Sequence, residues 1–160
     1  MAMFIAALIL IISTGMFFFY FHAICQRILR REFDKDYYLA IVNANRLEFP
    51  AVRRAAESWE APVDYARVQL TLRCDYLALT YLLKHAVNVN RRYTRQEWLL
   101  VVYFRTILLL LGLCHKLGLG ERSAILNLAA ILQYFANVIG QRVSALRFGE
   151  LSATDYLLSI

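Results

Sequence analysis

The sequence predicts an all-α protein with one N-terminal transmembrane helix followed by a small cytoplasmic helical bundle. Of its 160 residues, 60% are hydrophobic and 19% charged, whereas an average soluble domain is about 45–50% apolar and about 25% charged. The chain opens with a long uncharged stretch, and later apolar residues recur at helical spacing. We therefore divide it into a transmembrane anchor (1–26), a basic juxtamembrane region with connecting helices (27–61) and a helical bundle (62–160).

The anchor is the stretch from Met1 to Gln26, which contains no charged side chain. As a helix it would measure about 39 Å, more than the roughly 30 Å hydrocarbon core of a bilayer. A cleavable signal peptide is the alternative interpretation. It requires a basic start and a shorter apolar core, and this stretch has neither. We expect an uncleaved, single-pass anchor.

The residues that follow the anchor predict its orientation. Four basic residues lie in this basic cluster: Arg27, Arg30, Arg31 and Lys35. No basic side chain precedes the anchor, and cytoplasmic flanks of membrane helices carry an excess of Lys and Arg. We expect the N-terminus outside and the bulk of the chain in the cytoplasm, with the basic cluster at anionic lipid headgroups.

Two short helices are expected in the connecting region. Apolar residues at helical spacing predict the first from Phe33 to Val42, and Asn43 and Asn45 indicate a break after it. Pro50 predicts the start of a second helix that runs to about Ser58, because proline is tolerated in the first helical turn.

Two long helices follow in the expected bundle. Pro62 and Asp64 predict the start of a helix that continues to about Val89. Its inward face is expected to carry Val68, Leu72, Tyr76, Leu79, Leu83 and Val87. Thr94 and Glu97 have the spacing of a capping box, which predicts that the next helix begins at Arg95 and ends near Leu117.

A last long helix is expected from Arg122 to about Leu146, followed by a short closing helix that Ser152 and Asp155 would begin. One face of the long helix carries an uncharged stripe: Ser123, Asn127, Ala130, Tyr134, Asn137, Gln141 and Ser144. Because a solvent-exposed face usually collects Lys and Glu, we interpret this stripe as an interface with another helix or a partner protein.

The number of membrane spans depends on Arg95–Leu117 and Ser123–Gly140, which are also apolar. The most apolar part of the first, Leu99–Cys114, would reach only about 24 Å. Arg105 within it would cost about 2.5–3.5 kcal/mol at the bilayer centre. We therefore favour one span. Three spans, or a helical hairpin lying against or partly in the bilayer, are the alternatives.

Arg105 is expected to be a buried charge because its helix is otherwise so apolar. A buried guanidinium needs a carboxylate, carbonyl groups or water as partner. The candidate partners in this chain are Asp75 and Glu121, and a residue of another subunit is the alternative.

The sequence contains no acidic pair, glycine-rich phosphate loop, metal-ligand cluster or nucleophile motif, so we expect no catalysis and no cofactor of its own. The neighbours Cys114 and His115 would point about 100° apart on a helix. His22 is interpreted as an interfacial histidine, with contact to a pigment or haem of a partner subunit as the alternative. The basic cluster is interrupted by acidic residues and has no accompanying nucleic-acid-binding motif.

These observations predict an accessory or structural subunit of a larger membrane complex, such as a photosynthetic or respiratory one, whose helical domain caps or clamps a cytoplasmic face. Its partners would be the other subunits and the bilayer, with no nucleic acid or small-molecule substrate. A second hypothesis is an anchored module that binds a lipid, quinone or tetrapyrrole. Its polar contacts would come from Tyr76, Tyr81, Tyr103, Arg105 and Tyr134. A third is a scaffold that self-assembles through the uncharged stripe.

Overall fold

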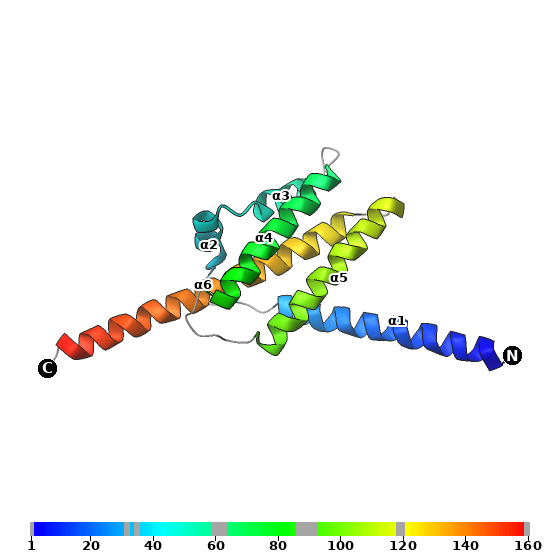
Figure 1. Ribbon diagram of the computed structural model, residues 1–160, viewed down its shortest axis with the longest axis horizontal. Helices are drawn as coiled ribbons and strands as arrows, with labels where there is room; N and C mark the ends of the chain where they lie inside the picture. Colours follow the sequence, from blue (N-terminus) through cyan, green and yellow to red (C-terminus); the bar gives the residue numbers. More distant parts are fainter. Residues whose placement is uncertain are drawn as a thin grey trace. The chain divides into compact units, whose positions relative to one another are not determined.

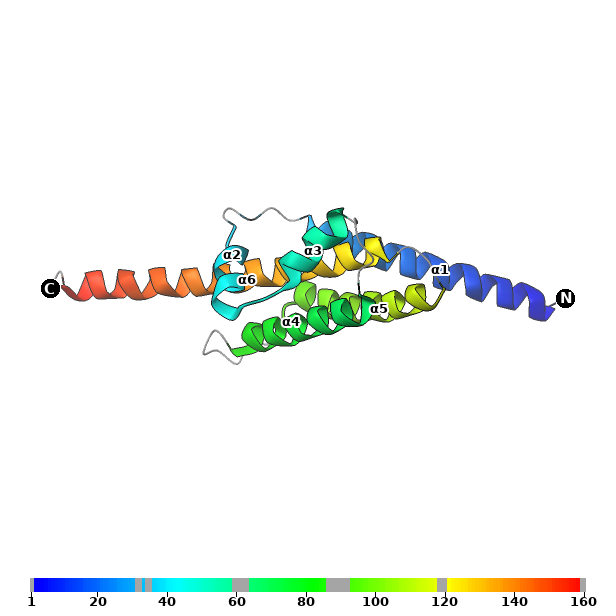
Figure 2. The ribbon, with the colours of Figure 1, turned by 90° about the horizontal axis from the view of Figure 1, so that it is seen from above.

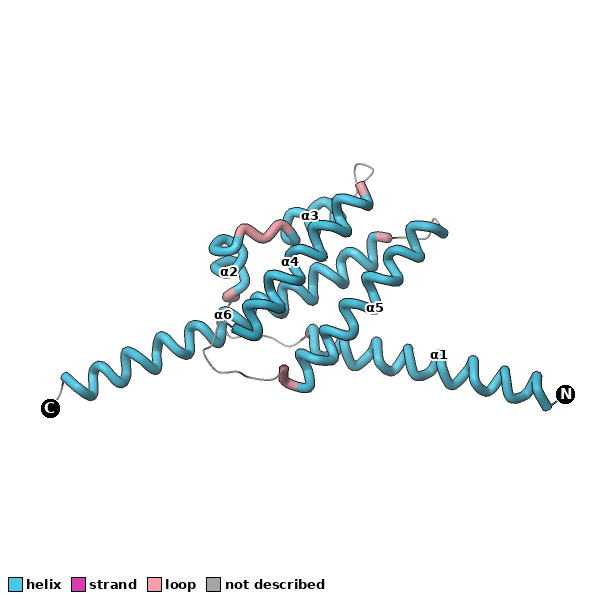
Figure 3. The backbone as a smooth tube through the Cα atoms, viewed as in Figure 1, coloured by secondary structure: helices cyan, strands magenta, loops and turns pink. Residues whose placement is uncertain are grey.

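The computed structural model is helical throughout its regular elements, as predicted. Figure 3 shows the six helices of the described residues: α1 (Ala2–Leu29), α2 (Tyr38–Asn45), α3 (Phe49–Ser58), α4 (Tyr65–His85), α5 (Arg95–Leu117) and α6 (Arg122–Leu158). The structure describes residues 2–30, 33, 36–58, 64–85, 93–117 and 121–158, and only the backbone for residue 2 and residues 146–158. It divides into two units, Met1–Glu32 and Phe33–Ile160, so that α2 and α3 belong with the later helices.

The first unit is formed by the single long helix α1. Its side chains from Met3 to Tyr20 are all exposed, which includes the large apolar residues along its length. The Thr14 hydroxyl donates to the Leu10 carbonyl oxygen at 2.7 Å. This bond satisfies a polar group that apolar surroundings would otherwise leave unpaired.

The second unit is built around α6. Among the described helices of this unit, α6 contacts α2, α3, α4 and α5. Figure 2 shows α2 and α3 on one side of α6 and α4 with α5 on the other, and α3 also contacts α4. About half of the largest fully buried side chains come from α6: Ile125, Leu128, Ile131, Leu132, Phe135 and Ile139. The apolar character of α6 is therefore largely explained by its place in the core.

The helix that was expected from Phe33 begins at Tyr38 instead, so that prediction was wrong at its start. Phe33 lies outside the helix, and its ring meets the ring of Tyr134 edge-on at 5.4 Å. The helix ends at Arg46, which adopts a left-handed conformation with φ of 52°. The Leu47 N–H then donates to the Val42 carbonyl at 3.1 Å, which closes the last turn.

The starts of the two long helices α4 and α5 agree with the sequence. Asp64 caps α4 by accepting the Ala66 N–H at 3.1 Å. In α5, the Thr94 N–H donates to Glu97 Oε2 at 3.0 Å and the Glu97 N–H donates to Thr94 Oγ1 at 3.3 Å, which confirms the capping box. The expected inward face of α4 is buried from Val68 to Leu83. Its expected end at Val87 lies outside the described residues.

The expected end of the last long helix near Leu146 was wrong. Instead, α6 continues without a break through Ser152 and Asp155 to Leu158, a length of 37 residues. No proline interrupts this stretch, and a lone glycine such as Gly149 costs only about 1 kcal/mol in a helix. Figures 1 and 2 show that the C-terminal part of α6 extends past the other helices of its unit.

Among the residues that the structure describes, three helices are long and apolar enough to cross a membrane. They differ in how much of the most apolar window is buried within the chain: 0% in Met3–Leu29, 28% in Arg95–Leu117 and 72% in Arg122–Ala145. These helices indicate membrane association. The expected single span is one of the arrangements that they permit.

Candidate functional site

The most distinctive surface of the second unit is the side of α4 and α5 that faces away from α6. The exposed large apolar side chains on these two helices are Leu70, Leu77, Tyr81, Trp98, Leu109, Leu110, Leu113 and Leu117. Among the described residues of the unit outside α4 and α5, Leu39 is the only other large apolar side chain classed as exposed. We call these eight residues, with the exposed Cys74 between them, the outer face.

Two ring stacks join α4 and α5, so these two helices are neighbours. Tyr76 stacks on Phe104 with ring centroids 4.2 Å apart, and Tyr65 stacks on His115 at 3.9 Å. Gly112 makes room for the first turn of α4, because a Cβ there would lie 3.2 Å from the Tyr65 hydroxyl. The two helices therefore meet through these long side chains, between Tyr65 and Tyr76 of α4.

On α4 and α5 the positively charged side chains lie at the surface and the negatively charged ones lie in the interior. Every Lys and Arg of the two helices is exposed: Arg67, Arg73, Lys84, Arg95, Arg105 and Lys116. Their acidic residues, Asp75 and Glu97, are both buried. Acidic residues at the ends of these helices have structural partners, since Asp64 caps α4 and Glu121 binds His115. The outer face is thus apolar with a basic border.

Asp75 caps α3 from the neighbouring helix α4. Its Oδ2 accepts the backbone N–H groups of Glu48 at 2.9 Å and Phe49 at 2.6 Å. Burial raises the pKa of this carboxyl, the two N–H donors lower it, and the charge of Glu48 raises it, with a net upward shift. Asp75 was a candidate partner for Arg105, and the structure gives it this capping role instead.

Glu97 joins the start of α5 to α6. Besides its capping bond to Thr94, its Oε1 accepts a hydrogen bond from an Nη2–H of Arg142. The Glu97 side chain is 4% exposed and that of Arg142 is 22% exposed. A buried carboxylate requires such a partner, so this pair fixes the register between α5 and α6.

The uncharged stripe of α6 is an internal contact at its centre. Tyr134 and Asn137 are buried, and Asn137 Oδ1 accepts the Tyr38 N–H at 2.8 Å, which caps α2. Beside them, a Cβ at Gly140 would lie 2.3 Å from the Tyr37 Cβ, so glycine permits the close approach of the chain leading into α2. Of the two alternatives expected for the stripe, Asn137 therefore shows the interface with another helix of this chain, and a partner protein is not needed to explain the burial of Tyr134 and Asn137.

The other five residues of the uncharged stripe are either exposed or partly buried. Ser123 and Gln141 are exposed, whereas Asn127, Ala130 and Ser144 are partly buried. A contact of these five residues with another protein stays a prediction.

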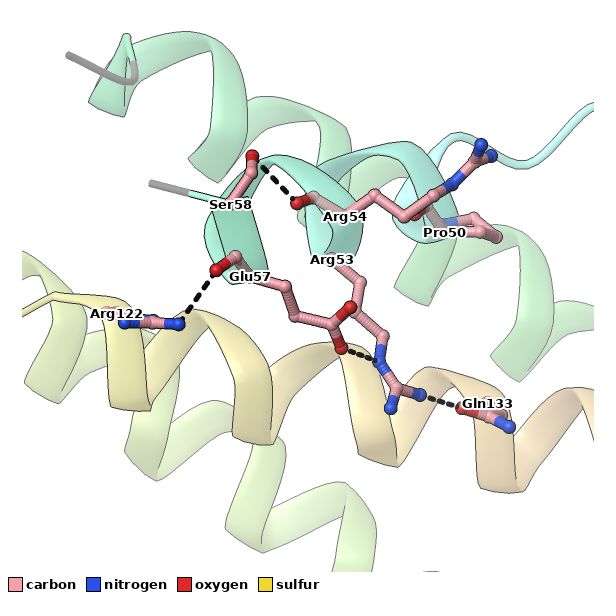
Figure 4. A network of polar contacts seen from close by, with 7 residues as sticks. All are labelled: Pro50, Arg53, Arg54, Glu57, Ser58, Arg122 and Gln133. Carbon is pink, nitrogen blue, oxygen red and sulfur yellow. Dashed lines mark hydrogen bonds and ion pairs between the residues drawn. The ribbon is translucent and has the colours of Figure 1, made fainter. Parts of the chain in front are cut away.

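A polar clasp holds α3 against α6 on the other side of the unit (Figure 4). Arg53 Nε donates to Glu57 Oε1 at 2.8 Å, and Arg53 Nη1 donates to the Gln133 side-chain oxygen. Arg122 Nη2 donates to the Glu57 carbonyl oxygen at 2.8 Å. Arg54 is exposed on the same helix. The charged side chains of Arg53 and Glu57 therefore serve the contact of α3 with α6.

A third polar cluster lies where α4, α5 and α6 meet. His115 Nδ1 is 2.7 Å from Glu121 Oε1, and the Tyr65 ring covers the imidazole. Burial raises the pKa of the Tyr65 phenol, and the nearby Glu121 carboxylate adds to the shift. The sequence analysis did not identify this contact. The six-residue separation of His115 and Glu121 in the sequence, with two glycines between them, was the available indication.

Arg105 is exposed on the outer face, so the expectation that this chain buries it was wrong. Helix α5 is apolar on both sides, but Arg105 lies on the side that faces away from α6. Its guanidinium therefore stays at the surface. Burial raises the pKa of the Tyr93 phenol, and the positive charge of Arg105 lowers it in part. Burial of Arg105 against another subunit or lipid stays a prediction.

The other predicted site residues are distributed over the chain. His22 and Arg27 are exposed on α1, and Arg30 is exposed directly after it. Arg31 and Lys35 lie outside the described residues. Cys25, Cys74 and Cys114 carry free thiols. No three His, Cys, Asp or Glu residues gather into a possible metal site in the described part of the chain.

The tyrosines expected to contact a bound quinone or tetrapyrrole do not converge with Arg105 on one site. Tyr76, Tyr103 and Tyr134 are buried in the core, while Tyr81 and Arg105 are exposed. Tyr76 is covered by Phe104, as described above. The arrangement favours packing roles for the buried tyrosines.

Comparison with protein-family models, curated proteins and solved structures found no match for this chain. The functional interpretation therefore rests on the geometry and chemistry of the chain itself.

Proposed function

We propose that this chain is a non-catalytic accessory subunit of a larger membrane protein complex. In this proposal α1 is its single transmembrane anchor and the second unit lies on the cytoplasmic side. The observation that carries the proposal is that none of the most apolar window of α1 is buried within the chain. Such a helix is stable where a bilayer covers it, and its side chains stay available for packing against other transmembrane helices.

The position of α6 supports a single span. Its apolar window is 72% buried by other helices of the same chain, so it needs no lipid to cover it. If α6 crossed the bilayer, α3 would enter with it and would carry Arg53 and Glu57 toward hydrocarbon. Charged side chains inside a membrane are costly. The core of a helical bundle outside the bilayer is the more favourable place for α6.

The pairing of α5 with α4 supports the same conclusion. Only 28% of the apolar window of α5 is buried, but the helix is packed along α4. Because α4 carries Arg67, Arg73 and Asp75 within its first half, it is a poor membrane span. Inserting α5 alone would break its contacts with α4.

The use of the buried polar groups supports a structural rather than a catalytic role. Asp75 and Asn137 cap helices, and Glu97 caps its own helix while it pairs with Arg142. In the part of the chain that the structure describes, every buried side-chain nitrogen or oxygen has a hydrogen-bond partner. Functional sites often contain polar groups that the fold itself does not need.

The projecting end of α6 supports the presence of a partner. Figure 1 shows this end extending away from the remaining helices of its unit. Short helices without tertiary contacts are only marginally stable in water. A neighbouring subunit that packs on this end would stabilise it.

Co-purification tests the proposal. The full chain with an affinity tag is extracted from its native membrane in a mild detergent and separated by size. We expect it to elute well above its 18.6 kDa mass, together with integral membrane proteins. A monomer that stays folded with no protein bound would contradict the proposal. Extraction in a denaturing detergent is the control, because it should release the same chain as a monomer.

A further inference from the structure

We propose that the outer face of α4 and α5 is a lipid-binding surface that lies flat on an anionic membrane leaflet. This goes beyond an anchored subunit, because it assigns a second membrane contact to the cytoplasmic unit and depends on no partner protein. The inference rests on the apolar content of the face and on its basic border.

The apolar residues of the outer face follow one side of each helix. Leu70, Leu77 and Tyr81 recur at intervals of seven and four along α4. Along α5, Trp98, Leu109 and Leu113 recur at intervals of eleven and four. Figure 2 shows α4 and α5 on the same side of α6, and the two ring stacks join them, so the two rows lie on neighbouring helices. Tyr and Trp are the aromatic residues preferred at membrane interfaces.

The charges of the face match an anionic surface. All six Lys and Arg side chains of α4 and α5 are exposed, and both acidic residues of these helices are buried. A protein interface that recognised mixed charges would place acidic groups at this border as well. Apolar residues with Lys and Arg around them are typical of helices that lie in the plane of an anionic membrane interface.

The position of Arg105 also fits this contact. In a spanning helix its charge would lie near the bilayer centre, where it is costly. In a helix that lies along the interface, a long arginine side chain can reach the phosphate layer while Leu109 and Leu113 contact the acyl chains. The same residue that argues against a span is therefore favourable at the surface.

Fluorescence of a label at Cys74 tests this proposal. Cys74 is exposed within the outer face. Cys25 and Cys114 are replaced by alanine, Cys74 carries a polarity-sensitive fluorophore, and the full chain is reconstituted in protein-free vesicles. In vesicles of mixed phosphatidylcholine and phosphatidylglycerol, we expect emission to shift to shorter wavelength and to be quenched by brominated acyl chains. The matched control replaces Cys74 by serine and labels Ala55→Cys, which is exposed on α3 and should stay in water.

Charge dependence gives the second part of the test. The outer face is in equilibrium between a membrane-bound state and a state free in water. Replacing Arg67, Arg73 and Lys116 by glutamine should lower the ratio of bound to free protein by about a hundredfold. Label shielding should then weaken, and it should also weaken in pure phosphatidylcholine and in high salt. A label that stays in water in anionic vesicles would overturn the proposal. The proposal would also be overturned if shielding of the Cys74 label did not depend on lipid charge and disappeared when the protein was diluted in lipid. That result would identify a dimer interface.

Trp98 provides a readout that leaves the outer face unchanged. The chain has two tryptophans, so Trp59→Phe leaves Trp98 as the single emitter. Brominated lipids should quench it in anionic vesicles, and absence of quenching would contradict the proposal. The Cys74 and Trp98 measurements both use the purified chain without partners. They can therefore fail while the co-purification test succeeds, and they can succeed while the co-purification test fails.

Discussion

At the N-terminus of α3, one carboxylate oxygen of Asp75 accepts two backbone N–H groups that the helix itself cannot satisfy. These donors lie 27 and 26 residues away in sequence. For this reason sequence patterns alone did not identify Asp75 as a cap. The Thr94–Glu97 capping box was identified because both partners lie within one helical turn.

Removing the Asp75 side chain tests its capping role. We expect Asp75→Ala to lower the free energy of unfolding by about 1–3 kcal/mol, because two buried N–H donors lose their acceptor. Asp75→Asn should stay within about 1 kcal/mol of the wild type, because an amide oxygen can still accept both bonds. Thermal unfolding of the full chain in detergent, followed by circular dichroism, measures the difference. Equal losses in the two variants would contradict the capping role.

The pH dependence of the same variants tests the raised pKa of Asp75. Because the native carboxyl has a pKa above its ordinary value of 3.8, the native state holds the proton more tightly than the unfolded chain. The stabilising contribution is present below that ordinary value and decreases as pH rises through the native pKa. Relative to Asp75→Asn, the wild type should therefore lose stability across this window as pH increases. A gain of wild-type stability over the same window would contradict this direction of the shift.

At the scale of helices, local chemistry predicted most of the starts. Proline and capping residues correctly indicated the first turns of α3, α4 and α5, and Arg95–Leu117 was predicted at both ends. The start of α2 was wrong because Phe33 packs on Tyr134, a contact that local periodicity does not reveal. The continuation of α6 was missed because a Ser and an Asp three residues apart imitate a helix start.

The link between α5 and α6 depends on the Glu97–Arg142 pair. We expect Arg142→Met to lower the free energy of unfolding by about 3–5 kcal/mol, because it leaves the buried Glu97 carboxylate without its cation. Glu97→Gln should cost less, since glutamine keeps the capping box and leaves the partly exposed Arg142 in contact with water. Thermal unfolding of both full-length variants provides the comparison. If Glu97→Gln proved the more damaging substitution, the assigned role of Arg142 would be wrong.

At the scale of the whole chain, composition predicted a helical membrane protein but not how its apolar surface is distributed. The apolar residues of α6 are used in the core, whereas those of α4 and α5 remain exposed on the outer face. Helical periodicity shows which residues share one side of a helix. It does not show whether that side meets another helix, lipid or water, and Arg105 was misinterpreted for this reason.

The central claim is that the chain crosses the membrane once, through α1, and that both ends of α5 lie on the same side. The direct test places single cysteines at Gln96 and Ser123, exposed positions near the two ends of α5, in a background without other cysteines. Sealed membrane vesicles of each orientation are treated with a membrane-impermeant maleimide. One span predicts that both positions react only from the cytoplasmic side. Reaction of the two positions from opposite sides would contradict the account, because α5 would then cross the bilayer.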